Sequence, residues 1–168
     1  KDPQDSRWVV KRIKADDADI LVASLPEIVL GFACDHPHIV PVKGYFIEKD
    51  SDNVGYNIYM KLPRMEKTLL SDFREREMKK NPFSEEEIIR HFYSLVCGLQ
   101  YLHNKNIYHG DIRHDNLLLD DKSCLKIADV GIAKYAEDED FNMAISGQKG
   151  TYTYSAPGIF GETAIKEK

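Results

Sequence analysis

Apolar and polar residues alternate along much of the first sixty positions, a pattern that is typical of half-buried β-strands. In "RWVVKRIK" the alternation places Val9, Lys11 and Ile13 on one face of a strand. The runs "VKGYFIEK" and "YNIYMKL" are aromatic and β-branched, and the polar "DSDNVG" between them predicts a turn. This part of the chain therefore predicts a small sheet.

One helix is expected among these strands. The segment "SLPEIVLGFA" predicts a short helix that follows the polar connection "ADDAD". Ser24 is the predicted N-cap, Pro26 falls in the first turn, and Glu27 takes the position that closes a capping box.

The pattern changes to a helical period after Pro63. "TLLSDFRERE" predicts a short amphipathic helix, and "SEEEIIRHFYSLVCGLQYLHNKN" predicts a longer one. Ser84 and Glu87 have the spacing of a capping box at the start of the longer helix. An apolar stripe follows along it at helical spacing: Ile88, Phe92, Leu95, Val96, Leu99 and Leu102.

Two short strands, "NLLLDD" and "LKIAD", predict a hairpin around residues 121–123, and mostly loop is expected after Asp129. The chain thus predicts an α+β fold in two lobes. Residues 1–62 form a small strand-rich lobe, and residues 63–168 form a helical lobe.

Composition narrows the choice of partners. The 168 residues are 42% hydrophobic and 30% charged, and the net charge of −5 argues against nucleic acid as a partner. No apolar run reaches the length of a membrane span, so no membrane partner is expected. The chain opens with no signal-like leader, and its three cysteines lack metal-ligand spacing. We therefore expect an intracellular protein, cytoplasmic or nuclear.

The stretch "IYHGDIRHDNLLLD" and the later "ADVG" carry the candidate chemistry. Asp111, Asn116 and Asp129 supply hard oxygen atoms of the kind that Mg²⁺ prefers. A carboxylate such as Asp111 can also accept the proton of an attacking hydroxyl. The pattern favours a phosphate-transfer site.

Five motifs resemble, in order, those of the eukaryotic-type protein kinase catalytic domain. They are "VVKRIK", "PEIVLGFACDHPHIV", "HGDIRHDN", "DVG" and "GTYTYSAPG". The resemblance covers nearly the whole chain and implies a two-lobed kinase fold that is truncated at both ends. The glycine-rich loop and the last helices of the large lobe are the parts expected to be missing.

The resemblance implies ATP and Mg²⁺ as cofactors. Lys11 corresponds to the lysine on the α- and β-phosphates, with Lys14 as the alternative, and Val9 would cover the adenine. Glu27 would pair with this lysine, although the capping box is a competing use for its carboxylate.

In the catalytic loop the resemblance implies that Asp111 is the base and Arg113 a cation at the transferring phosphate. Asn116 and Asp129 would hold Mg²⁺, and His109 would be a buried structural residue.

The segment "GTYTYSAP" resembles serine/threonine protein kinases, which hold protein substrates there, and Thr151 would lie near the base.

Gly110, where protein kinases usually carry arginine, resembles small-molecule kinases of the aminoglycoside and choline type. A pseudokinase scaffold that binds nucleotide without transfer is a further alternative. A protein substrate is expected, and a regulatory protein partner is a second expectation.

Three glycines depart from the family pattern. Gly110 predicts a base that is not coupled to phosphate on the activation segment. Gly31 and Val130 predict a thin contact between the first helix and the metal-binding motif. Gly158 stands where the family carries glutamate in its Ala-Pro-Glu motif.

Overall fold

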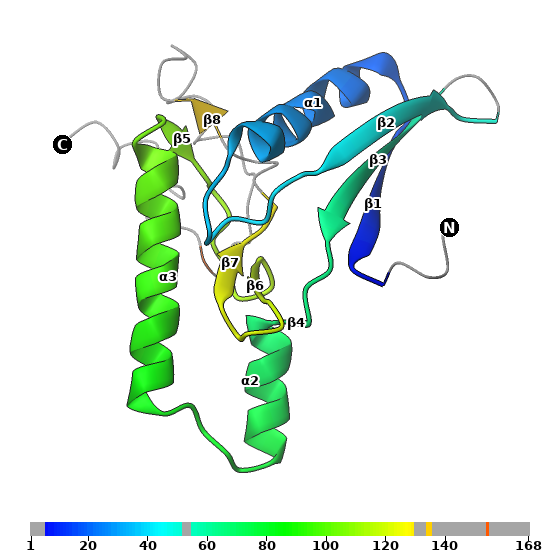
Figure 1. The fold of residues 1–168 in the computed structure, drawn as a ribbon. Helices are drawn as coiled ribbons and strands as arrows, with labels where there is room; N and C mark the ends of the chain where they lie inside the picture. Colours follow the sequence, from blue (N-terminus) through cyan, green and yellow to red (C-terminus); the bar gives the residue numbers. More distant parts are fainter. Residues whose placement is uncertain (1–5, 52–54, 130–133, 136–153, 155–168) are drawn as a thin grey trace.

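The structure is a computed structural model that describes residues 6–51, 55–129, 134–135 and 154. Figure 1 shows a strand-rich part beside a helical part, which confirms the α+β architecture expected from the sequence. The strand-rich part contains β1 (Trp8–Ala15), α1 (Ala18–Ala33), β2 (Gly44–Lys49) and β3 (Tyr56–Pro63). The helical part contains β4 (Lys67–Thr68), α2 (Leu69–Met78), α3 (Glu85–His103), β5 (Ile107–Tyr108), β6 (Leu117–Leu119), β7 (Leu125–Ile127) and β8 (Lys134–Tyr135).

The first sheet is antiparallel, with strand order β1-β3-β2, and α1 packs against one of its faces. The three strands of this sheet match those expected from the alternation. Ile28 of α1 forms a buried cluster with Ile58 and Met60 of β3 and with Val42. Because Lys11 is the β1 neighbour of Met60, the sheet places the lysine close to this core.

In the helical part, β6 and β7 form the predicted hairpin, with Leu117 opposite Ile127. The helix α3 lies close to β7 because Gly98 has no side chain. A Cβ atom at residue 98 would lie 2.8 Å from the Cδ1 atom of Ile127. The capping box of Ser84 and Glu87 is confirmed at the start of α3.

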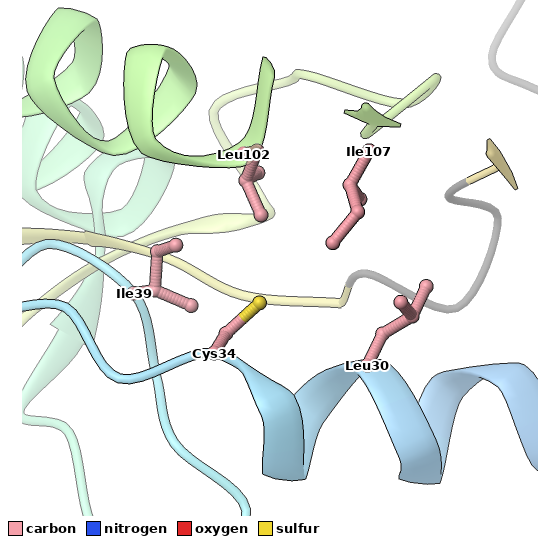
Figure 2. Packing of buried hydrophobic residues seen from close by; sticks show 5 residues of the cluster. All are labelled: Leu30, Cys34, Ile39, Leu102 and Ile107. Carbon is pink, nitrogen blue, oxygen red and sulfur yellow. The ribbon is translucent and has the colours of Figure 1, made fainter. Parts of the chain in front are cut away.

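A buried cluster joins the two parts of the chain. Figure 2 shows its side chains directed towards one another from the end of α1, the segment that follows it, α3 and β5: Leu30, Cys34, Ile39, Leu102 and Ile107. The segment after α1 also pairs with β7. The Val40 amide donates to the Ile127 carbonyl, and the Ile127 amide donates to the His38 carbonyl. These bonds fix the position of α1 relative to the hairpin.

The start of α1 differs from the sequence prediction. The helix begins at Ala18, and its N-cap is Asp17, whose side chain accepts a hydrogen bond of 2.8 Å from the Ile20 amide. Ser24 lies inside the helix and donates to the Ile20 carbonyl, and Pro26 is also internal. The prediction was wrong because aspartate caps a helix at least as well as serine, and the earlier start adds more than one helical turn. Glu27 is therefore not a capping residue.

Part of the apolar stripe on α3 is exposed. Ile88, Phe92 and Val96 are 56%, 65% and 45% exposed, whereas Leu102 is fully buried. Among the described residues, no helix has the length and apolar character needed to cross a membrane. The division between residues 62 and 63 remains a prediction.

The corrected helix start predicts different costs for two substitutions. Asp17→Ala should lower the free energy of unfolding by about 1 kcal/mol, because it removes the N-cap hydrogen bond. Ser24→Ala should change the free energy of unfolding by less than about 0.5 kcal/mol. The Ser24 hydroxyl donates only to the Ile20 carbonyl, which already accepts a hydrogen bond within the helix. Urea unfolding of both variants measures the difference, and a larger loss at Ser24 would contradict the observed helix start.

Candidate active site

A cavity of about 350 Å³ lies where the first sheet and α1 approach the β6–β7 hairpin. Its walls are largely apolar and include Val9, Val42, Met60, Leu62, Leu118 and Ile127. Its charged lining residues are Lys11, Glu27, Lys67, Asp115 and Asp129. An apolar cavity with a few charged groups on its wall suits a ligand that has a flat apolar group and an anionic part.

Lys11 is the centre of the polar side of this cavity. Its Nζ atom lies 2.7 Å from Oε1 of Glu27 and also donates to Oδ1 of Asp129. Burial pulls the pKa of Lys11 down, but the hydrogen bonds and charges of Asp129 and Glu27 outweigh it, so the pKa lies above the ordinary lysine value. Lys11 therefore stays charged at neutral pH. Lys14, the alternative in the sequence, pairs instead with Asp16.

The β6–β7 hairpin brings Asn116 close to Asp129, which lines the cavity. The Ala128 amide donates to the Asn116 carbonyl at 2.9 Å, so Asp129 follows directly after a residue bonded to Asn116. Asp129 has a φ angle of 58°, which is uncommon for a residue with a side chain and is found at functional sites.

Asn116 and Asp129 fit a Mg²⁺ ion because each offers a side-chain oxygen atom as a ligand. The amide nitrogen of Asn116 donates to Asp111, to its carbonyl and to its Oδ2 atom, both at 2.9 Å. This orientation leaves the amide oxygen of Asn116 for a ligand. Within the described part of the chain, no group of three or more His, Cys, Asp or Glu residues is arranged around a metal. The arrangement suits a Mg²⁺ ion that takes most of its ligands from phosphate and water.

Gly110 has a backbone conformation that favours glycine, and its predicted lack of coupling to phosphate on the activation segment stays a prediction. Its φ angle is 77°, in the left-handed region that glycine adopts without steric cost. His109 beside it is 2% exposed, as expected of a structural histidine. Its Nε2 atom lies 2.8 Å from the Ala128 carbonyl, and its Nδ1 atom accepts from the Asp111 amide. Because burial lowers the pKa of His109, the ring is neutral and fixes the backbone on either side of the site.

Arg113 is held by Asp115, a residue that the sequence analysis did not single out. Nε of Arg113 lies 3.0 Å from Oδ2 of Asp115, and Nη2 donates to the same oxygen. The side-chain hydrogen bond raises the pKa of Arg113 and lowers that of Asp115. The one signal for this pair in the sequence is "RHD", in which a single residue separates the opposite charges of Arg113 and Asp115. Thr151 lies outside the described residues, so its expected place near Asp111 stays a prediction.

Gly31 does not leave a void next to α1, because Val42 fills the space. A Cβ atom at residue 31 would lie 2.3 Å from Cγ2 of Val42, and the Val42 amide donates to the Gly31 carbonyl at 3.2 Å. Gly31 lies one helical turn after Glu27, so this contact holds the helix where the Glu27 carboxylate reaches Lys11. The contact expected with Val130 lies outside the described residues.

The family of the chain follows from comparison with known proteins. Residues 1–168 match the family described as "Protein kinase domain", so the chain belongs to this family.

Several curated relatives are kinases. The chain is 33% identical over 138 residues to a calcium/calmodulin-dependent protein kinase kinase of Caenorhabditis elegans, covering 82% of the chain and 24% of that protein. It is 34% identical over 128 residues to mitogen-activated protein kinase kinase kinase 3 of Arabidopsis thaliana, covering 76% and 18%. It is 33% identical over 127 residues to cyclin-dependent kinase 10 of Rattus norvegicus, covering 74% and 34%. The chain thus spans well under two thirds of these relatives.

The contact between Gly31 and Val42 can be tested by a double-mutant cycle. Gly31→Ala should lower the free energy of unfolding by about 1–3 kcal/mol, because the new methyl group overlaps Val42. In a Val42→Ala background the same substitution should cost clearly less, since the Cγ2 atom of Val42 is removed and only its Cβ atom, 3.2 Å away, remains close to the new methyl group. Urea unfolding of the four proteins measures the coupling, and an equal loss in both backgrounds would contradict the contact.

Proposed function

We propose that the protein is a serine/threonine kinase, which transfers the γ-phosphate of ATP to Ser or Thr hydroxyls of protein substrates. The observation that carries the proposal is the pairing of Lys11 with both Glu27 and Asp129 in the wall of a largely apolar cavity. A phosphotransferase needs this combination of an apolar wall and a fixed cation beside carboxylates, because its catalysis rests on positioning and charge.

On the nucleotide side, the adenine would lie against the apolar wall that includes Val9. The ammonium group of Lys11 would bind the α- and β-phosphates, with Glu27 keeping it oriented. When bound, Mg²⁺ would neutralise phosphate charge, with Asn116 and Asp129 supplying its protein ligands.

On the acceptor side, the Asp111 carboxylate would orient the substrate hydroxyl and accept its proton as the new bond to phosphorus forms. The hydrogen bonds from Asn116 to Asp111 support this role, because they restrict the rotation of the carboxylate. Arg113 would neutralise charge on the transferring phosphoryl group. Thr151 would contribute to the substrate side, as the resemblance to "GTYTYSAP" implies.

Protein substrates are favoured over small molecules by the family of the chain and by the kinases among its relatives. The serine/threonine preference is supported by the "GTYTYSAP" segment. A regulatory protein partner that controls the position of α1 belongs to the same proposal, because α1 carries Glu27.

The proposed transfer predicts a large effect of one isosteric change. In the full-length protein that contains this sequence, Asp111→Asn should lower kcat for phosphorylation of a protein substrate mixture by at least about 10²-fold, because the amide cannot accept the hydroxyl proton. The measurement is incorporation of label from γ-labelled ATP, with Asp121→Asn in the exposed β6–β7 turn as the matched control that should keep wild-type activity.

Two results would sink the proposal. Equal labelling by the wild-type protein and Asp111→Asn would indicate a pseudokinase scaffold. Labelling of amino alcohols or aminoglycosides, with none of the protein mixture, would indicate a small-molecule kinase.

A further inference from the structure

The guanidinium group of Arg113 has a carboxylate partner within the catalytic loop itself. Both Nε and Nη2 of Arg113 donate to one oxygen, Oδ2 of Asp115. Contacts through two nitrogen atoms fix the plane of a guanidinium group more closely than one contact does. The two side chains are also about one-third exposed, so each remains within reach of a bound substrate.

Asp115 lies between the two sides of the site. It lines the cavity together with Lys11 and Asp129, and it is adjacent in sequence to Asn116, which bonds Asp111. Its carboxylate therefore connects the wall of the cavity to the cation on the acceptor side.

Several charges act on this pair. Asp115 has the largest effect on the Arg113 guanidinium, and the charge of Asp111 also attracts it. Arg74 and His114 lie near enough to Asp115 to stabilise its charge. Two carboxylates thus compete for one cation.

We propose that Asp115 is a positioning residue that holds the Arg113 guanidinium where it can neutralise the transferring phosphoryl group. The inference rests on the proposed function, and it adds a residue that neither the sequence motifs nor the family match assigned. A lysine in place of Arg113 would be a point charge on a flexible stem and would need no such orientation. A planar guanidinium acts in one orientation only, so this chain needs a residue that fixes its plane.

The pairing itself can be tested without any activity. In protein with ¹⁵N-labelled arginine, the Nε–H signal of Arg113, assigned by its loss in Arg113→Lys, should exchange slowly with water. Asp115→Asn should speed this exchange at least about fivefold, because an amide oxygen is a weaker acceptor than a carboxylate. Asp115→Glu should keep slower exchange than Asp115→Asn, and equal exchange in the wild type and Asp115→Asn would overturn the pairing.

Kinetics then test the positioning role. Asp115→Asn should lower kcat about tenfold with KM for ATP changed by less than about twofold, because an interaction at the transferring group is lost. Asp115→Glu should recover part of kcat, and Asp115→Asn should have little further effect in an Arg113→Lys background. A raised KM for ATP with unchanged kcat would overturn the inference and assign Asp115 to nucleotide binding.

The exchange measurement and the kinetic measurement together separate this inference from the proposed function. A wild-type protein that transfers no phosphate above the Asp111→Asn background overturns the proposed function and the kinetic role of Asp115. Fast exchange of Arg113 in an active wild-type protein overturns the positioning inference alone.

Discussion

The site depends on one ammonium group that two carboxylates share. Lys11 comes from β1, Glu27 from α1, and Asp129 from the residues after β7, so three elements must meet within hydrogen-bonding distance of one nitrogen atom. Two carboxylates that both contact one ammonium group would repel each other without it, and the charge of Lys11 offsets that repulsion. The charge is only partly withdrawn from water, with side-chain exposures of 35% for Lys11 and 16% for Glu27. The cation therefore remains accessible to an anionic ligand.

The rest of the fold holds Lys11, Glu27 and Asp129 close enough together to form these hydrogen bonds. The bonds of residues 38 and 40 to Ile127 fix the exit of α1 against β7, which leads directly to Asp129. The cluster of Leu30, Cys34, Ile39, Leu102 and Ile107 covers the same junction with buried apolar surface. Gly31 lets the helix approach Val42 one turn beyond Glu27. Apolar packing thus positions α1 against β7. The hydrogen bonds of Lys11 with Glu27 and Asp129 then fix the orientation of the three side chains.

The elements with a strong period could be predicted from the sequence, and the helix start could not. The strands around Lys11, the β6–β7 hairpin and the capped helix α3 all follow from local patterns that the structure keeps. The prediction placed the N-cap of α1 at Ser24 and took Asp17 as part of a polar connection, because local patterns do not rank the two residues as caps. Choosing Ser24 made Glu27 look like a capping residue, whereas the structure directs Glu27 to Lys11. The Arg113–Asp115 pair and the fit of Val42 against Gly31 depend on side-chain distances in three dimensions, which spacing alone does not give.

The central claim is that Lys11, and not its neighbour Lys14, is the cation that binds the nucleotide. The most direct measurement is the melting temperature of the protein with and without MgATP, for the wild type, Lys11→Met and Lys14→Met. Ligand at about 100 times its Kd stabilises the folded state by about 2.7 kcal/mol, which should raise the melting temperature of the wild type by several degrees. The account predicts the same rise for Lys14→Met and almost none for Lys11→Met. A full rise in Lys11→Met, or its loss in Lys14→Met alone, would contradict it.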